Sequence, residues 1–144
     1  MQVSILLQQK GPDVVTVAPD VPISEVVSVL TQNRIGAVVV SADGHHIDGV
    51  LSERDIVEAL AERGAEILES RAAEHMSSEV FTCQPDTTVE TLMATMTDHR
   101  VRHVPVLVDG ELAGLVSIGD VVKDRISSLE NETQVLHDYI THPR

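Results

Sequence analysis

The chain has 144 residues, 42% of them hydrophobic, which is enough for one compact domain with a real core and excludes a disordered polypeptide. Its formal net charge of −13, with only ten Lys and Arg, disfavours binding to a phosphodiester backbone. With one Tyr, one Phe and no Trp, the chain has no aromatic platform for stacking single-stranded bases. We therefore expect an aliphatic core and no nucleic-acid function, whereas a small anionic ligand is compatible with this charge.

The cellular compartment is indicated by cysteine usage and by the first ten residues. A single cysteine, Cys83, excludes an intramolecular disulfide and fits a reducing environment. No basic segment followed by a long apolar run opens the chain, so no signal peptide is predicted. No segment approaches the length of an apolar membrane span. We expect a cytoplasmic protein with no membrane contact.

Two stretches of the chain repeat each other at an offset of 66 residues, with Val15 matching Phe81. Residues 15–20 and 81–86 each predict a short strand followed by Pro-Asp. An amphipathic helix follows in each copy, with apolar residues spaced i, i+3, i+4, i+7. These apolar residues are Ile23, Val26, Val27 and Leu30 in the first copy and Val89, Leu92, Met93 and Met96 in the second.

Each helix is followed by two predicted strands and a turn. Short β-branched runs favour strands over 37–40 and 47–52 in the first copy and over 104–108 and 112–117 in the second. The turns are Asp43-Gly44 and Asp109-Gly110, and the offset falls to 65 at His45-His46, where a hairpin loop absorbs one residue.

A second helix starts after Ser52 and after Ser117, so the unit is strand–helix–strand–strand–helix, written twice. We expect one pseudo-symmetric domain of the α/β (α+β) class, because neither copy has enough apolar surface to fold alone. The predicted boundaries are 11–62 for the first unit, 63–75 for a linker or helix, 76–128 for the second unit and 129–144 for a helical tail. The last helix is predicted over about 121–139.

The strand-to-helix junctions carry the same short motif. Residues 49–55 read Gly-Val-Leu-Ser-Glu-Arg-Asp and residues 114–120 read Gly-Leu-Val-Ser-Ile-Gly-Asp. Both resemble the G-h-h-[ST]-x-x-D signature of CBS (cystathionine-β-synthase) domains, where h is apolar. Two such motifs in tandem resemble a Bateman module, and the resemblance covers about residues 11–126. It implies two βαββα units with facing sheets and two pseudo-symmetric clefts that bind adenosine-containing ligands.

The Ser and Asp of each motif are the candidate ribose ligands: Ser52, Asp55, Ser117 and Asp120. They are predicted at helix N-termini, where N–H groups and the helix dipole favour anions. An ionised Asp can accept hydrogen bonds from both ribose hydroxyls. The same residues are ordinary helix caps. Their presence in both copies favours the ribose role.

The resemblance also implies that each cleft takes ribose contacts from one copy and adenine contacts from the other. The first cleft would join Ser117, Ile118 and Asp120 to the first copy, and the second cleft would join Ser52 and Asp55 to the second copy. Apolar walls suit a purine, although these residues could equally be core. The expected adenine contacts are Val14, Val15, Thr16, Ile35, Gly36 and Ala37 for the first cleft, and Val80, Phe81, Thr82 and Val101 for the second.

The copies differ where phosphates are expected. Gly36-Ala37 corresponds to Arg102-His103, and Arg54 corresponds to Gly119. The planar fork of Arg suits a phosphate, so we predict Arg54, Arg102 and His103 as phosphate ligands, with a solvated strand edge as the alternative. The clefts should therefore be inequivalent, and two phosphate subsites would also accommodate a dinucleotide such as NAD(H).

Catalytic motifs are missing from the sequence. It contains no H-E-x-x-H, G-x-S-x-G, Walker lysine loop or G-x-G-x-x-G. The histidines His45, His46, His99 and His103 lack metal-ligand spacing, and Cys83 is expected to be a small buried residue. No catalytic residue, metal or catalytic cofactor is predicted.

The expected function is a regulatory, energy-sensing module that binds AMP, with ATP, ADP or NAD(H) as alternatives. No effector domain is attached, so regulation would act on an unknown protein target or through oligomerisation. The resemblance implies a homodimer. Its candidate interface is formed by the helix segments at 56–60 and 121–126, with the internal core as the alternative role for each. The tail at 127–144 is either a dimer helix or a partner-docking element. The alternative is a structural or protein-interaction module with no physiological nucleotide.

Overall fold

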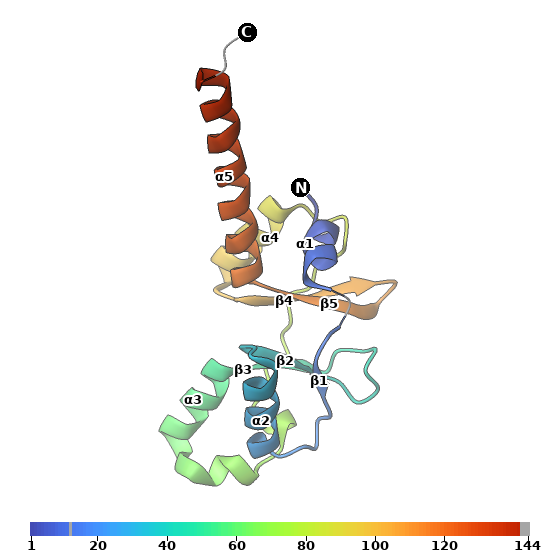
Figure 1. Cartoon of the computed structure of the whole chain (residues 1–144). Coiled ribbons are helices and arrows are strands. Elements are labelled where there is room, and N and C mark those ends of the chain that lie inside the picture. The colour runs from blue at the N-terminus through green and yellow to red at the C-terminus, as the bar shows by residue number, and fades with distance from the viewer. Residues whose placement is uncertain (12, 142–144) are drawn as a thin grey trace.

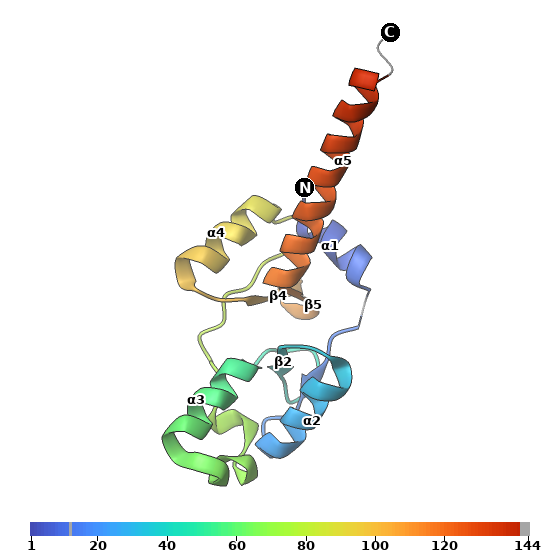
Figure 2. The same ribbon diagram turned by 60° about the vertical axis from the view of Figure 1, so that its left-hand side comes forward.

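The computed structural model describes residues 1–11 and 13–141, which form two α/β halves stacked on each other (Figure 1). The sheets of the two halves face each other, and the helices lie on the outer sides (Figures 1 and 2). A backbone hydrogen bond from Leu112 N–H to the His45 carbonyl, 2.7 Å long, joins the halves. The facing of the two repeats is therefore as the sequence predicts.

The first half follows the predicted element order. It contains β1 (Thr16–Val17), α2 (Ile23–Asn33), β2 (Ala37–Val40), β3 (Gly49–Ser52) and α3 (Glu53–Arg63). The strand order is β1-β2-β3, with β1 parallel and β3 antiparallel to β2. Every residue of β2 is buried, because this central strand is covered on both faces.

The stretch between the repeats belongs to the first half and is more than a linker. It forms the 3-10 helices η1 (Gly64–Glu69) and η2 (Ala72–Glu74). Ile67 and Ala72 are fully buried in the core of α2 and β2. The N–H of Ile23 donates to the Ser70 carbonyl at 2.9 Å, which ties this stretch to the start of α2.

The second half contains α4 (Val89–His99), β4 (His103–Val108), β5 (Glu111–Ser117) and α5 (Ile118–Thr141). The first strand predicted for the second copy, which begins near Phe81, is wrong, since this segment forms only one parallel bridge, between Cys83 and Val106. In a parallel ladder the next bond would run from the N–H of residue 105 to the carbonyl of residue 81. Pro105 has no N–H, so the ladder stops after one bridge.

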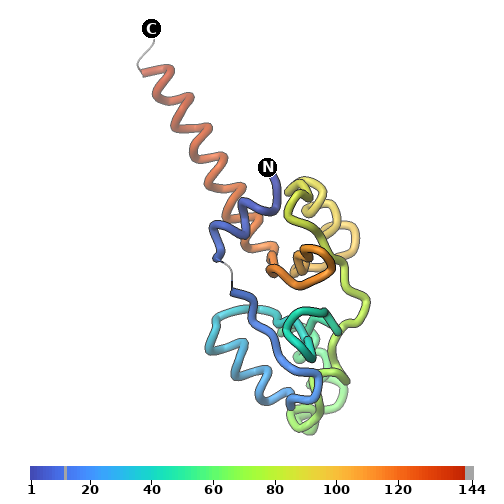
Figure 3. Tube along the Cα trace, turned by 90° about the vertical axis from the view of Figure 1, so that its right-hand side faces the viewer, coloured from blue at the N-terminus to red at the C-terminus, as the bar shows by residue number. Residues whose placement is uncertain are grey.

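The N-terminal helix α1 (Val3–Lys10), which the repeat pattern does not predict, completes the second half. Val3 and Leu6 are buried with Leu92, Val104 and Val116. Figure 3 shows α1 beside the base of α5, on the second half and not on the first half that follows it in sequence. The chain therefore crosses between halves twice.

Two further details differ from the predicted pattern. Val27 and Met93 were expected on the buried helix faces, but each is 38% exposed. In both α2 and α4, only the other three of the four predicted apolar residues are buried against the core. Helix α5 runs without a break past residue 128 and projects from the body (Figure 2). Among residues 1–11 and 13–141, no helix has the length and apolarity needed to cross a bilayer.

Candidate functional site

Both signature motifs fold into the same hydrogen-bonded box where a strand passes directly into a helix. In the first, Asp55 N–H donates to Ser52 Oγ at 3.2 Å and Ser52 N–H donates to Asp55 Oδ2 at 2.9 Å. In the second, Asp120 N–H donates to Ser117 Oγ at 3.2 Å and Ser117 N–H donates to Asp120 Oδ2 at 2.8 Å. These four residues therefore cap helices. Within the described part of the chain, the hydrogen bonds to both carboxylates are made at Oδ2, and Oδ1 of each accepts none.

The glycine that opens each motif is required by packing. A Cβ on Gly49 would lie 2.6 Å from Met76 Sδ and 2.8 Å from the Ser77 carbonyl oxygen. A Cβ on Gly114 would lie 2.5 Å from Leu7 Cδ2. Both motifs therefore keep glycine because a neighbouring segment lies against the strand at that point.

Lys10 extends the second box into a charged cluster. Its Nζ donates to Asp120 Oδ2 at 2.8 Å and to the Leu115 carbonyl at 2.7 Å. Burial raises the pKa of Asp120, but the Lys10 ammonium and the Ser117 N–H outweigh it, and the net shift is downward. Asp120 is thus held as a carboxylate. Sequence reasoning missed Lys10, because it lies outside the repeat and no motif includes it.

His103 brings the first half to the same cluster. A Cβ on Gly36 would lie 3.4 Å from His103 Nε2 and 3.3 Å from Glu53 Oε1, so the residue that precedes β2 meets the first residues of α3 and β4 here. Burial lowers the pKa of His103, and the Lys10 ammonium acts in the same direction, against the carboxylates of Asp120 and Glu53. Gly36 and Asp120, which are predicted for the first cleft, and the predicted phosphate ligand His103 therefore share one neighbourhood with Lys10.

The predicted second cleft is organised differently. Phe81 stacks on His99, with ring centroids 4.0 Å apart and planes at 19°. Arg54, predicted as a phosphate ligand, instead pairs its Nε with Glu58 Oε1 at 3.1 Å on the exposed side of α3. Of the residues predicted as phosphate ligands, Arg54 is therefore paired with a carboxylate, whereas His103 lies beside the Lys10–Asp120 pair.

The predicted adenine contacts divide into core and partly exposed residues. Ala37 is buried, Val15 and Ile35 pack on the core of the first half, and Val101 packs on that of the second. Ala37 is thus part of the core, the alternative that the sequence left open, and the other three pack on the core while keeping some solvent exposure. The remaining predicted adenine contacts are partly or fully exposed: Val14, Thr16, Gly36, Val80, Phe81 and Thr82. The predicted ligands Arg102 and Ile118 are exposed as well.

Other reactive groups lie outside these clefts. Burial raises the pKa of the Cys83 thiol to about 11, so the prediction of a small buried residue is confirmed. His46 Nδ1 lies 2.6 Å from Asp43 Oδ2 in the turn, and this hydrogen bond raises the pKa of His46. Across residues 1–11 and 13–141, no three His, Cys, Asp or Glu side chains are grouped to hold a metal.

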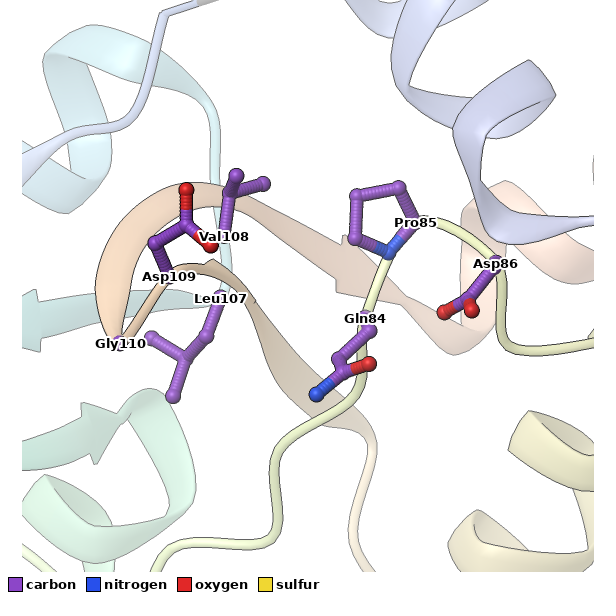
Figure 4. Close-up of a pocket in the computed structure, with 7 residues that line it drawn as sticks. All are labelled: Gln84, Pro85, Asp86, Leu107, Val108, Asp109 and Gly110. Carbon is purple, nitrogen blue, oxygen red and sulfur yellow. The ribbon is translucent and has the colours of Figure 1, made fainter.

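A hollow in the surface of the second half, shown in Figure 4, contains none of the predicted ligand residues. It lies between the β4–β5 turn and the segment that precedes α4. Its lining residues are Gln84, Pro85, Asp86, Leu107, Val108, Asp109 and Gly110. We assign no function to it, because its lining contains no cationic side chain that could hold an anionic ligand.

The facing halves and the duplicated Ser-x-x-Asp boxes define a paired α/β repeat module. The family model of the CBS domain matches residues 11–62 and 72–126, and the chain belongs to this family. The "CBS domain-containing protein CBSX3, mitochondrial" of Arabidopsis thaliana is 34% identical over 84% of this chain, and the match spans 61% of the length of that protein. The CBS domain-containing protein YhcV of Bacillus subtilis is 30% identical over 80% of this chain and 81% of its own length.

Solved structures share the CBS-pair fold. A CBS-domain protein from Agrobacterium tumefaciens is 49% identical with a TM-score of 0.83, and the match covers 87% of this chain and 99% of that one. A CBS domain protein from Pyrobaculum aerophilum, in complex with AMP, is 34% identical with a TM-score of 0.78, over 92% of this chain and 99% of that one. The predicted fold class is confirmed.

Proposed function

We propose that this CBS pair is a non-catalytic regulatory module that binds an adenine nucleotide in its clefts and acts through a protein partner or through oligomerisation. AMP is the first ligand to test, with ATP, ADP and NAD(H) as alternatives. The observation that carries the proposal is the duplicated box, in which a helix-capping carboxylate keeps one oxygen available for a ribose hydroxyl. The AMP complex of the Pyrobaculum aerophilum protein supports this choice.

The first cleft supplies complementary groups for each part of a nucleotide. Asp120 would accept the ribose hydroxyls, and the half-buried Val14 and Thr16 would contact adenine. The phosphate would be held by cations, of which this side offers Lys10, Arg102 and His103. The second cleft has Asp55 for the ribose and Phe81 for adenine, but its predicted cation, Arg54, is paired with Glu58. We therefore propose tighter phosphate binding in the first cleft.

Calorimetric titration of the full chain with AMP, ATP, NADH and adenosine tests the proposal. Asp120→Asn and Asp55→Asn should each remove one binding event, because Asn keeps an acceptor for the helix cap but loses the charge. Asp109→Asn, in the exposed β4–β5 turn, is the matched control. In thermal denaturation, a ligand at a hundredfold its Kd should add about 2.7 kcal/mol to the free energy of unfolding.

Three outcomes would overturn the proposal. Absence of stabilisation by any adenosine compound would exclude the nucleotide sensor. Full binding by the Asp55→Asn, Asp120→Asn double variant would show that these carboxylates are not the ribose ligands. Recovery of a chemically altered nucleotide after incubation would show catalysis, whereas unaltered nucleotide supports a regulatory role.

One observation favours the second candidate, an interaction module with unused clefts. The Lys10 ammonium already neutralises the Asp120 carboxylate, as in a purely structural ion pair. If this candidate is correct, Asp120→Asn should change the free energy of unfolding and leave nucleotide binding unchanged. The titration above separates the two functions directly.

A further inference from the structure

Helix α5 carries an apolar stripe that the rest of the chain leaves uncovered. Val121 is its buried residue, and past the first turns the helix projects away from both halves (Figures 1 and 2). The exposed apolar residues include Val122 at 49%, Ile126 at 51%, Leu129 at 55%, Leu136 at 62% and Ile140 at 73%. An apolar row of this length on a projecting helix marks an interaction surface.

The spacing of the stripe is that of a coiled coil. Val122, Ile126, Leu129, Thr133, Leu136 and Ile140 are separated alternately by four and three residues, which is the a/d pattern of a heptad repeat. The a positions hold Ile126, Thr133 and Ile140, all β-branched, and two of the three d positions hold Leu. β-branched residues at a with Leu at d favour a parallel, two-stranded assembly.

The surface of α5 already has the shape that this packing needs. A shallow hollow is lined by Ile126, Leu129, Glu130 and Thr133, with Gln134 at its edge. The first four are related as i, i+3, i+4 and i+7, the diamond of side chains into which a knob from a facing helix inserts. In a parallel dimer, the d-position Leu129 of a second copy would occupy this hollow.

Charges beside the stripe select the orientation of the pair. In a parallel dimer each g position faces the e position of the next heptad of the partner helix. Arg125 would then face Glu130 of the second copy, and Glu132 would face its His137. An antiparallel pair centred on the stripe would instead bring Glu130 near Glu130 and Glu132 near Glu132. The acidic residues therefore oppose the antiparallel arrangement.

We propose that two copies of this chain associate through α5 as a parallel, in-register coiled coil over residues 122–140. The contact is about 27 Å long, at 1.5 Å per residue. Because it has fewer than three full heptads, association should depend on protein concentration. The proposal is independent of nucleotide binding, since none of its residues belongs to the clefts.

Sedimentation velocity of the full chain over a range of concentrations tests the assembly. The wild type should shift from monomer to dimer, and Leu129→Glu with Leu136→Glu should remain monomeric. Val135→Glu is the matched control, because Val135 is 68% exposed on the same helix but lies off the stripe. Its dimer should persist. Circular dichroism verifies that each variant is folded. A monomeric wild type at every concentration, or a dimer unaffected by the Leu variants, would overturn the proposal.

Cysteine cross-linking tests the orientation. In a Cys83→Ala background, Ile140→Cys should form a disulfide-linked dimer on oxidation, since a disulfide needs Cα atoms about 4.4–6.8 Å apart. An antiparallel pair would hold the two copies of residue 140 at opposite ends of the helix. Val135→Cys should cross-link poorly. Cross-linking between Val122→Cys and Ile140→Cys chains, without Ile140→Cys homodimers, would overturn the parallel arrangement.

Discussion

Lys10 Nζ lies 2.8 Å from Asp120 Oδ2, so the N-terminal helix reaches the carboxylate of the second signature motif. The two side chains are 34% and 26% exposed, and they are joined only through the tertiary fold. A ribose that binds Asp120 must share this carboxylate with the ammonium or displace it. Lys10 is therefore positioned both to oppose the ribose and to attract the phosphate of a nucleotide.

Replacing Lys10 with Met should affect adenosine and AMP differently. Adenosine has no phosphate, so its affinity should rise roughly two- to fivefold when the ion pair that competes for Asp120 is removed. AMP should gain less or lose affinity, because its phosphate loses a cation. The measurement is the ratio of the two Kd values by calorimetry. Lys123→Met, which removes the other lysine of the chain, is the control, and an unchanged ratio in Lys10→Met would contradict this role.

The affinity for AMP should increase as the pH falls from neutral toward the lowered pKa of His103. In the free protein burial lowers the pKa of His103, so its ring is neutral at neutral pH. A bound phosphate favours the protonated ring and raises this pKa, so binding takes up a proton between the free and bound values. One such proton changes Kd by at most about tenfold per pH unit.

The proton uptake can be measured by titrating AMP in buffers of different ionisation enthalpy. His103→Gln should reduce the uptake, and adenosine, which has no phosphate, should show little in the wild type. Lys10, Arg102, Glu53 and Asp120 surround the ring and remain in this variant. Equal proton uptake in His103→Gln and wild type would assign the proton to the phosphate and not to the histidine.

The Cys83 thiol should resist alkylation in the folded protein. Burial raises its pKa to about 11, and its side chain packs with Leu92 and Val106. Iodoacetamide at pH 8 should therefore modify it slowly and react faster as urea unfolds the second half. Mass spectrometry follows the modification. Rapid alkylation without denaturant would show that local unfolding of the second half costs little free energy.

Much of the fold could be predicted because it is duplicated. The offset between Val15 and Phe81 aligned helices, strands and turns, and both Ser-x-x-Asp boxes form where the motif placed them. The missing strand near Cys83 depends on one absent N–H, at Pro105 of a different strand. A local pattern cannot show this, because β propensity does not include the hydrogen-bonding capacity of a distant partner.

The candidate site was less accessible to sequence reasoning. The Lys10–Asp120 pair joins residues 110 positions apart, and Lys10 has no counterpart in the repeat. Arg54 was predicted as a phosphate ligand by its place in the motif, but Glu58, one helical turn later, pairs with it. By contrast, the heptad spacing from Val122 to Ile140 is a local pattern, so the sequence alone contains it.

The two motif glycines should differ in their sensitivity to alanine. Gly49→Ala should lower the free energy of unfolding by about 1–3 kcal/mol, because the new Cβ meets the Ser77 backbone oxygen, which is held by its bridge to Val50. Gly114→Ala should cost less, since the obstacle is the mobile end of the Leu7 side chain. Urea denaturation measures both changes.

A double variant tests why Gly114→Ala should destabilise the fold less than Gly49→Ala. If Leu7 Cδ2 is the obstacle at Gly114, then Leu7→Ala creates the space that the new methyl group needs. Gly114→Ala should therefore be less destabilising in the Leu7→Ala background than in wild type, a non-additivity typical of residues in direct contact. Gly49→Ala should show the same cost in both backgrounds, because Leu7 belongs to the other half of the molecule. Additive costs at Gly114 would show that α1 does not pack on this strand in solution, and the Lys10–Asp120 contact would then be in doubt as well.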